Sequence, residues 1–309
     1  MPLHPEAEAF IAQTEGRTSM WQLPLEQSRI VYNTAVAMLA GPPEAVAEVR
    51  DLSAPGPGGP IPIRLYRPET PRPPIFVFLH GGGWRLGGLE SHGGPARAIC
   101  NRSGWAVAAV DYRLAPENRF PAALDDTLAA ALWLRDSAPE LGLDGSRIAI
   151  GGDSAGGNLA AAACIAARDR GGPRFGLQVL IYPGTLAGAQ TVSRRENSHL
   201  LAPGDIGLAE REYVDDPREF GNPLVSPLLA PDLSRLPDAL VITGEYDPLR
   251  DEGEEYAHRL REAGSEVSLT RYEGMVHGFF QMGAIMADGR RSIEEIAAAL
   301  RAKAAGPSP

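Results

Sequence analysis

Short apolar runs recur along this chain and alternate with segments of helical pattern. The runs occupy residues 61–66, 75–79, 106–110, 148–150, 177–182, 239–243 and 267–271. The helical patterns occupy residues 91–102, 121–136, 154–170, 248–263 and 292–303. The middle runs lack polar alternation, as expected of strands that are covered on both faces. Strands that alternate with helices predict an α/β domain built on a mostly parallel sheet.

Two segments interrupt this alternation. Residues 1–45 have helical character before the first predicted strand, and residues 184–225 are polar, proline-bearing and partly helical without strand character. An insertion of that length late in an α/β sheet is more often functional than a bare connection. The length of 309 residues fits one large sheet-based domain with elaborations.

The charged and sulfur-containing residues exclude several classes of function. The chain carries 29 basic and 39 acidic residues, and a net charge of −10 would repel a nucleic acid. Lys303 is the only lysine, which excludes a P-loop and argues against a Schiff-base enzyme. Cys100 and Cys164 form no CxxC pair and lie near no histidine cluster, so neither a zinc site nor a disulfide framework is predicted. Both thiols are expected to pack between helices.

The N-terminal residues and the overall hydropathy bear on localisation. Residues 1–17 carry early acidic residues and no apolar h-region, so they do not read as a secretory signal. No stretch approaches the roughly 18 apolar residues of a membrane span. The expectation is a soluble cytoplasmic protein with neither a membrane nor a nucleic acid as partner.

The pentapeptide Gly-Asp-Ser-Ala-Gly at residues 152–156 follows the apolar run 148–150 and opens an alanine-rich helix. This G-x-S-x-G pattern, between a strand and a helix, is typical of a nucleophile elbow. Flanking glycines allow a tight turn that presents Ser154 at the carboxyl end of the sheet. The alternative is a structural serine that caps a helix in a glycine-rich turn.

A second glycine-rich loop follows the buried strand at residues 75–79. The sequence His-Gly-Gly-Gly-Trp at residues 80–84 can turn backbone N–H groups toward a developing oxyanion, because no Cβ obstructs the approach. In this arrangement, the residue after the nucleophile, Ala155, supplies another donor. A dinucleotide-binding loop fails on spacing, since Leu86 stands where GxGxxG requires glycine.

A nucleophilic serine needs a base, and the chain has six histidines. Elimination favours His277, which lies just after the last predicted strand, at the same end of the sheet as Ser154. His4 is near the terminus, His92 and His258 lie in helical patterns, His199 falls in the insertion, and His80 precedes the glycine loop in a structural position.

The acid that orients the base should lie between the serine and the histidine in the chain. Asp247 follows the strand at residues 239–243 and is mildly preferred over Glu245 and Asp251. An aspartate followed by proline is also a good helix cap, so a structural role for Asp247 stays open at this point.

The motifs together resemble the hormone-sensitive-lipase-like esterases, also called bacterial family IV carboxylesterases. The matching sequences are HGGGW at 80–84, VDYRLAPE at 110–117, GDSAGGN at 152–158, YP at 182–183, SPLLA at 226–230, DPLRDEG at 247–253 and HGF at 277–279. The resemblance implies an α/β-hydrolase core of eight strands, with a helical cap formed from residues 1–45 and 184–225. Asn118 stands where this family often has histidine, and the N-terminal segment matches only loosely.

The resemblance also implies the roles of the site residues and the reaction. It makes Ser154 the nucleophile, Asp247 the orienting acid and His277 the base, without a metal or other cofactor. The implied oxyanion donors are the N–H groups of Gly82, Gly83 and Ala155. The expected reaction is hydrolysis of short-chain carboxylic esters through an acyl-enzyme.

Several alternatives remain at this stage. An amidase, a deacetylase or a longer-chain lipase would use the same triad, whereas a ligand receptor of this fold would lack the base, which His277 supplies. Trp84 either lines the substrate pocket or only supports the oxyanion loop. The final predicted strand, at residues 267–271, would pair with a second copy if it forms a free edge, which gives a homodimer as a hypothesis.

Overall fold

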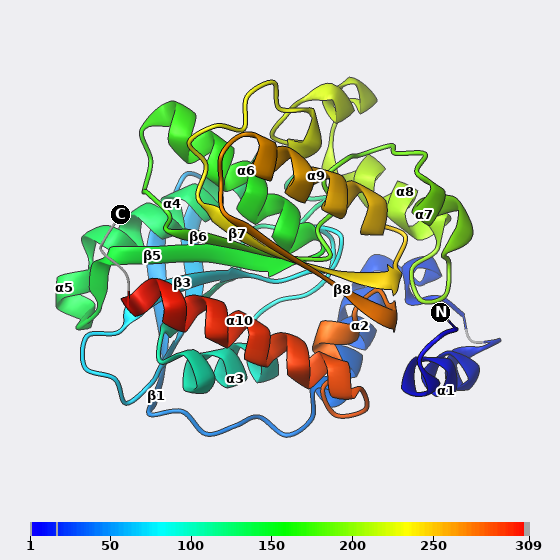
Figure 1. The fold of residues 1–309 in the computed structure, drawn as a ribbon, viewed down its shortest axis with the longest axis horizontal. Helices are drawn as coiled ribbons and strands as arrows, with labels where there is room; N and C mark the ends of the chain where they lie inside the picture. The colour runs from blue at the N-terminus through cyan, green and yellow to red at the C-terminus, as the bar shows by residue number, and fades with distance from the viewer. Residues whose placement is uncertain (1, 17, 306–309) are drawn as a thin grey trace.

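An eight-stranded sheet forms the centre of the protein, as seen in a computed structural model that describes residues 2–16 and 18–305 (Figure 1). The strands lie in the spatial order β1-β2-β4-β3-β5-β6-β7-β8. β1 pairs with β2 and β2 with β4 in antiparallel fashion, and all other neighbours are parallel. The predicted α/β fold with a mostly parallel sheet is therefore confirmed. The strands are β1 Glu48–Gly56, β2 Gly59–Arg67, β3 Pro74–Leu79, β4 Ala106–Val110, β5 Asp144–Asp153, β6 Leu177–Ile181, β7 Asp238–Tyr246 and β8 Val267–Val276.

Helices cover both faces of the sheet. α3 and α10 lie on one face, and α4, α6 and α9 pack against the other, as the two layers of Figure 1 show. Each of the five overlaps a predicted helical segment; α3, α4, α6 and α9 begin and end within two residues of the prediction, whereas α10 begins five residues earlier than predicted. Their bounds are α3 Gly93–Ser103, α4 Ala122–Asp136, α6 Ala155–Arg170, α9 Arg250–Glu262 and α10 Ala287–Ala305.

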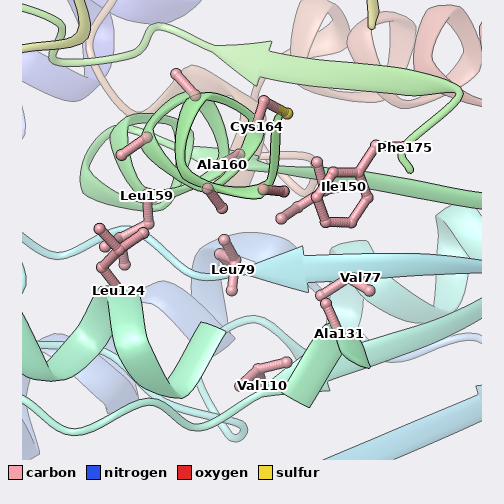
Figure 2. Close-up of a cluster of buried hydrophobic side chains, with 14 of the residues drawn as sticks. Val77, Leu79, Val110, Leu124, Ala131, Ile150, Leu159, Ala160, Cys164 and Phe175 are labelled. Atoms are coloured by element: carbon pink, nitrogen blue, oxygen red, sulfur yellow. The ribbon is translucent and has the colours of Figure 1, made fainter. Parts of the chain in front are cut away.

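The two faces explain why the central strands are continuously apolar. Val77 and Leu79 of β3 belong to the core beneath α4 and α6, whereas Phe76 and Phe78 belong to the core beneath α3 and α10. Successive side chains of a strand point to opposite faces, so both sets must be apolar when both faces are covered. Figure 2 shows Val77 and Leu79 among the side chains of the first core, with Cys164 of α6 close by.

The sequence patterns did not predict β1. Its residues are mostly exposed or half-buried, and Ala54 is its one fully buried residue. β1 lies at an edge and, among the residues described, pairs with β2 alone, so packing does not demand the apolar run by which the other strands were found. β8 extends five residues beyond its predicted end, and a register irregularity with β7 falls between Gly244 and Tyr246.

The two segments that interrupt the alternation form helices near the carboxyl ends of the parallel strands. In Figure 1, α1, α2, α7 and α8 gather around the arrowheads of β7 and β8. Residues 1–45 contain α1 Pro5–Thr14, η1 Met20–Gln22 and α2 Leu25–Ala40, and residues 184–225 contain α7 Val192–Glu196, α8 Pro203–Tyr213 and η2 Pro217–Gly221. Three further short helices are α5 Ala138–Leu141, η3 Pro227–Leu229 and η4 Phe279–Gln281.

The remaining sequence predictions concern membrane spans, thiols and the single lysine. Over residues 2–16 and 18–305, no helix is both long and apolar enough to cross a bilayer. Cys100 in α3 and Cys164 in α6 are both buried and unbridged, as expected of packing thiols. Lys303 in α10 pairs with Asp238, the first residue of β7.

Candidate active site

Four loops meet at the carboxyl edge of the sheet and carry the predicted site residues. Ser154 directly follows β5, Asp247 follows β7, His277 follows β8, and the glycines at 81–83 come soon after β3. Parallel strands end at the same edge of a sheet, which brings residues far apart in sequence to one place. The chain order of the three polar side chains is serine, aspartate, histidine.

Ser154 has a backbone conformation that residues other than glycine rarely adopt. Its φ is +55° and its ψ is −117°, and α6 begins at the next residue. A Cβ at Gly152 would lie 2.1 Å from the carbonyl oxygen of Leu79, and one at Gly156 would lie 2.0 Å from the same atom. Both glycines are therefore required for the turn to pack against the end of β3.

A hydrogen-bonded chain links the three polar side chains. His277 Nε2 lies 3.0 Å from Ser154 Oγ, and His277 Nδ1 lies 2.8 Å from Asp247 Oδ2. The Asp247 carboxylate only accepts, so in the neutral imidazole the proton lies on Nδ1 and leaves Nε2 to accept from the serine hydroxyl. The His277 side chain is 13% exposed and that of Asp247 is fully buried. The serine end of this hydrogen-bonded series is therefore partly exposed, whereas the acid end is fully buried.

The rival acids have other partners. Glu245 accepts a hydrogen bond of 2.7 Å from the N–H of Gly274. Asp251 accepts one of 2.7 Å from the N–H of Ser193 and pairs with Arg250. Of the three carboxylates, only Asp247 hydrogen-bonds to His277 in the described part of the chain. Its second oxygen accepts from the N–H of Leu249 at 2.7 Å, which fixes the carboxylate.

Three backbone N–H groups lie on the serine turn or on the glycine loop that contacts this turn through Gly81 and Asp153. Gly82 and Gly83 have φ values of +120° and +62°, which a residue with a side chain would adopt only with strain. Ala155 is the first residue of α6, whose first-turn N–H groups have no acceptor inside the helix. Among the described residues, none of these three N–H groups donates to a protein acceptor. Each is available to an anionic oxygen.

Trp84 is nearly buried, with 7% of its surface exposed. Its indole stacks on the ring of Tyr213 in α8, with centroids 4.2 Å apart and planes at 8°. That stacking joins the glycine loop at residues 80–84 to the insertion at residues 184–225. His80, expected to be structural, stacks on Tyr112 at 4.3 Å, and its Nδ1 lies 2.8 Å from the carbonyl oxygen of Gly81.

Two residues near the site were not singled out from the sequence. Trp21 of η1 belongs to the N-terminal segment, and a Cβ added at Gly83 would lie 2.8 Å from its ring. It packs on an apolar cluster of Leu201, Ile206 and Leu249. Asp153, the last residue of β5, accepts a hydrogen bond from the N–H of Gly81. The sequence did hold a signal for Asp153, which is a charged residue at the end of an apolar strand. Nothing in the sequence indicated that Trp21 lies near the site.

The histidines set aside by elimination lie elsewhere. His92 precedes α3, whereas the sequence placed it within a helix, and its ring is buried against Asp153 and Gln281. His258 is exposed on α9, and His4 caps α1. The ring of His199 lies 6.0 Å from that of Tyr246. Over the described residues, no group of three or more His, Cys, Asp or Glu side chains could hold a metal ion.

Known proteins with similar sequences and structures share this architecture. Residues 76–281 match the family model described as the alpha/beta hydrolase fold. The chain is 45% identical over 272 residues to the carboxylic ester hydrolase LipN of Mycobacterium tuberculosis, covering 84% of this chain and 72% of LipN. It is 36% identical over 317 residues to the ethyl acetate hydrolase of Pseudomonas putida, covering 97% and 99%. A solved structure of a hyperthermophilic esterase from the archaeon Pyrobaculum calidifontis aligns with a TM-score of 0.94 at 42% identity, covering 99% of this chain and 100% of the other.

Proposed function

Because this chain belongs to the alpha/beta-hydrolase family, as a carboxylesterase of the hormone-sensitive-lipase-like group, we propose that Ser154, His277 and Asp247 carry out its ester hydrolysis. The observation that supports these roles is the pair of hydrogen bonds at His277, which accepts from the Ser154 hydroxyl at 3.0 Å and donates to Asp247 at 2.8 Å. The same residue argues against a ligand receptor, which would not need a base beside the serine.

The first half of the reaction forms an acyl-enzyme. Ser154 Oγ bonds to the ester carbonyl carbon while His277 Nε2 takes the hydroxyl proton, and the carbonyl π electrons move onto its oxygen. The N–H groups of Gly82, Gly83 and Ala155 hold that oxyanion. The bond to the alcohol oxygen then breaks, and His277 gives its proton to the departing alcohol. Asp247 stabilises the imidazolium and keeps Nε2 directed at the serine.

The second half repeats these steps with water in place of the alcohol. Water loses a proton to His277 Nε2 as its oxygen bonds to the acyl carbon, and the same three N–H groups hold the second oxyanion. Collapse breaks the bond to Ser154 Oγ, which recovers its proton from His277. The products are one acid and one alcohol for each water consumed.

The substrates are short-chain carboxylic esters. One relative over nearly the whole length of both chains is named an ethyl acetate hydrolase. Trp21 beside Gly83, with the apolar cluster of Leu201, Ile206 and Leu249, would bring bulky side chains close to the reacting carbonyl and leave little length for an acyl chain.

Residues 1–45 and 184–225 act as a cap over this site. Trp21 from the first segment and Ala209 from the second both approach Gly83, where an added Cβ would lie 2.8 Å and 2.9 Å from them. Arg29 of α2 donates to the carbonyl oxygen of Arg85 at 3.0 Å, and Arg85 in turn pairs with Glu212 of α8 at 2.5 Å. Both cap segments therefore contact the glycine loop and Arg85, which follows it.

The test is a set of substitutions assayed with p-nitrophenyl acetate. Ser154→Ala should lower kcat by at least about 10⁴-fold, because the nucleophile is lost. Asp247→Asn should cost far more activity than Glu245→Gln, since only Asp247 orients the base. Ser53→Ala, on the exposed face of β1, is the matched control and should keep full activity. A Ser154→Ala protein that folds and still turns over would refute the assignment.

A further inference from the structure

We propose that the carboxylate of Asp153 is a positioning residue that holds the nucleophile turn, the oxyanion loop and the loop of the base in fixed relation. This proposal rests on the proposed function, because it assigns no new reaction. Asp153 is the residue before Ser154 and is only 1% exposed. A buried carboxylate is costly unless several donors converge on it, so its partners indicate what it holds together.

The first partner is the oxyanion loop. Asp153 Oδ1 accepts a hydrogen bond of 2.9 Å from the N–H of Gly81, which immediately precedes Gly82 and Gly83. Gly81 has no need of glycine for its φ, but a Cβ there would lie 2.3 Å from Asp153 Oδ2. The glycine is therefore explained by the close approach of the carboxylate. Through this bond, donors on one loop are fixed relative to a nucleophile on another.

The second partner is the segment after the base. Asp153 Oδ2 accepts a hydrogen bond from the side-chain amide of Gln281, which lies in η4, four residues after His277. The same amide nitrogen lies 2.7 Å from Nε2 of His92, and that ring nitrogen lies 3.2 Å from Asp153 Oδ1. All three side chains are buried. One carboxylate beside the nucleophile thus contacts groups on two other segments of the site, the glycine loop and the segment after His277.

Ser91, His92 and Asp153 have the residue types of a second Ser-His-Asp triad. All three side chains are buried, so a substrate cannot reach Ser91. Ser91 Oγ lies 2.8 Å from His92 Nδ1, and Ser91 is fully buried. Its hydroxyl oxygen already accepts from the N–H of Gly88 at 3.1 Å and donates to that residue's carbonyl oxygen at 2.9 Å. Burial raises the pKa of Asp153, but His92, His80 and the Gly81 N–H more than offset it and hold the pKa below its ordinary value. The carboxylate is therefore a fixed, ionised acceptor.

The consequence is a specific kinetic effect. Oxyanion stabilisation depends on donors placed within a few tenths of an ångström of the transition-state oxygen, and a misplacement of 1 Å costs about 100-fold. Substrate binding before the reaction depends much less on those donors. Removal of the Asp153 carboxylate should therefore lower kcat and leave KM almost unchanged.

The experiment compares Asp153→Ala with Asp153→Asn. Alanine should lower kcat by about 10- to 100-fold with KM within about threefold, and should weaken inhibition by a short alkyl trifluoromethyl ketone by a similar factor, because that inhibitor forms an oxyanion on the serine. Asparagine keeps an acceptor for the Gly81 N–H and should recover most of the loss. Unchanged kcat, or an increase confined to KM, would overturn the proposal.

Two further variants separate this role from a general loss of stability. Asp126→Ala removes another buried carboxylate, that of Asp126 in α4, which pairs with Arg113 at 2.8 Å. This variant should leave kcat and inhibitor affinity unchanged. If Asp153→Ala does not fold, Gln281→Leu removes one donor to the carboxylate and should lower kcat by about threefold to tenfold at unchanged KM. Full kcat in Gln281→Leu would then contradict the proposal. Failure here, together with an inactive Ser154→Ala, would leave the proposed function intact.

Discussion

Ser154 is held in an unfavourable backbone conformation by the structure around it. Its backbone conformation costs on the order of 1–3 kcal/mol, which the surrounding structure must offset. The N–H of Ser154 donates to Ile181 in β6 at 2.8 Å, and its carbonyl oxygen accepts from Asn158 at 3.0 Å. The strained residue is thus held from both sides by regular structure, and its hydroxyl is presented to His277.

His80 makes the stability of the folded protein depend on pH. Burial lowers its pKa to about 3, and the nearby His92 acts in the same direction. In an unfolded chain the pKa of histidine is about 6.5. Between about pH 3 and about pH 6.5, His80 is therefore protonated in the unfolded state but neutral in the folded state. Folding stability should therefore fall as pH drops below about 6.5, by up to about 1.4 kcal/mol for each pH unit.

Urea denaturation between about pH 7 and about pH 5 measures this dependence, in a window above most carboxyl titrations. His80→Gln should lose less stability over that interval than the unsubstituted protein does. His258→Gln, an exposed histidine on α9, should leave the pH dependence as it was. Equal slopes for His80→Gln and the unsubstituted protein would show that His80 is not the group responsible.

Among the helices and strands, those with a strong packing requirement were the ones predictable from sequence. β3 is buried along its entire length and was predicted to within one residue, whereas the exposed edge strand β1 was missed. The glycine-containing parts of the candidate site were predictable as well, because a turn that requires glycine at fixed positions, such as residues 152–156, leaves a recognisable motif in the sequence. Asp153 and Trp21 contact residues that are distant in sequence, and although the charge of Asp153 at the end of an apolar strand was visible, the sequence did not indicate the partners of either residue.

The insertion is joined to the core by a buried ion cluster. Arg194 of α7 pairs with Glu252 of α9 at 2.7 Å and with Glu210 of α8 at 2.8 Å, and its side chain is 8% exposed. Arg194→Met should lower the free energy of unfolding by about 3–5 kcal/mol, because two buried carboxylates lose their cation. Urea denaturation measures the change.

Arg218→Met is the matched control for this cluster, since Arg218 pairs with Asp216 on an exposed 3₁₀ helix. It should leave the unfolding midpoint where it was, because an exposed ion pair is screened by water. If Arg194→Met also left the midpoint unchanged, the cluster would contribute nothing to holding α7 and α8 on the core.

The 3₁₀ helix η1 should control acyl length through Trp21. Trp21→Ala removes an indole from beside Gly83 and should raise the ratio of kcat/KM for an octanoyl ester to that for an acetyl ester by about tenfold. A rate series over p-nitrophenyl esters of increasing acyl length measures this ratio. Ile30→Ala, on the outer face of α2 and 64% exposed, should not alter it. An unchanged ratio in Trp21→Ala would place the acyl chain elsewhere.

At the scale of the whole molecule, β8 lies at an edge of the sheet, and in the described part of the chain β7 is its one neighbouring strand. The N–H of His4 donates to the carbonyl oxygen of Gly274 near the end of β8 at 3.0 Å, so part of this edge is already occupied. The part of an edge strand that has no neighbour can pair with the same strand of a second copy. We therefore predict a homodimer, with a mass in light scattering of twice the chain mass of 32.9 kDa that falls toward the single-chain value on dilution. One species at 32.9 kDa over the whole concentration range would refute this.

The pairing of Lys303 with Asp238 places the chain's one lysine side chain at the start of β7, while Asp247, the proposed catalytic acid, directly follows its end. A strand rises about 3.3 Å per residue, so roughly 26 Å separate the two ends of this nine-residue strand. Coupling to an amine-reactive support would therefore attach the enzyme only at this far end or at the α-amino group. Molecules held through Lys303 would share one orientation, with the esterase site turned toward the solution.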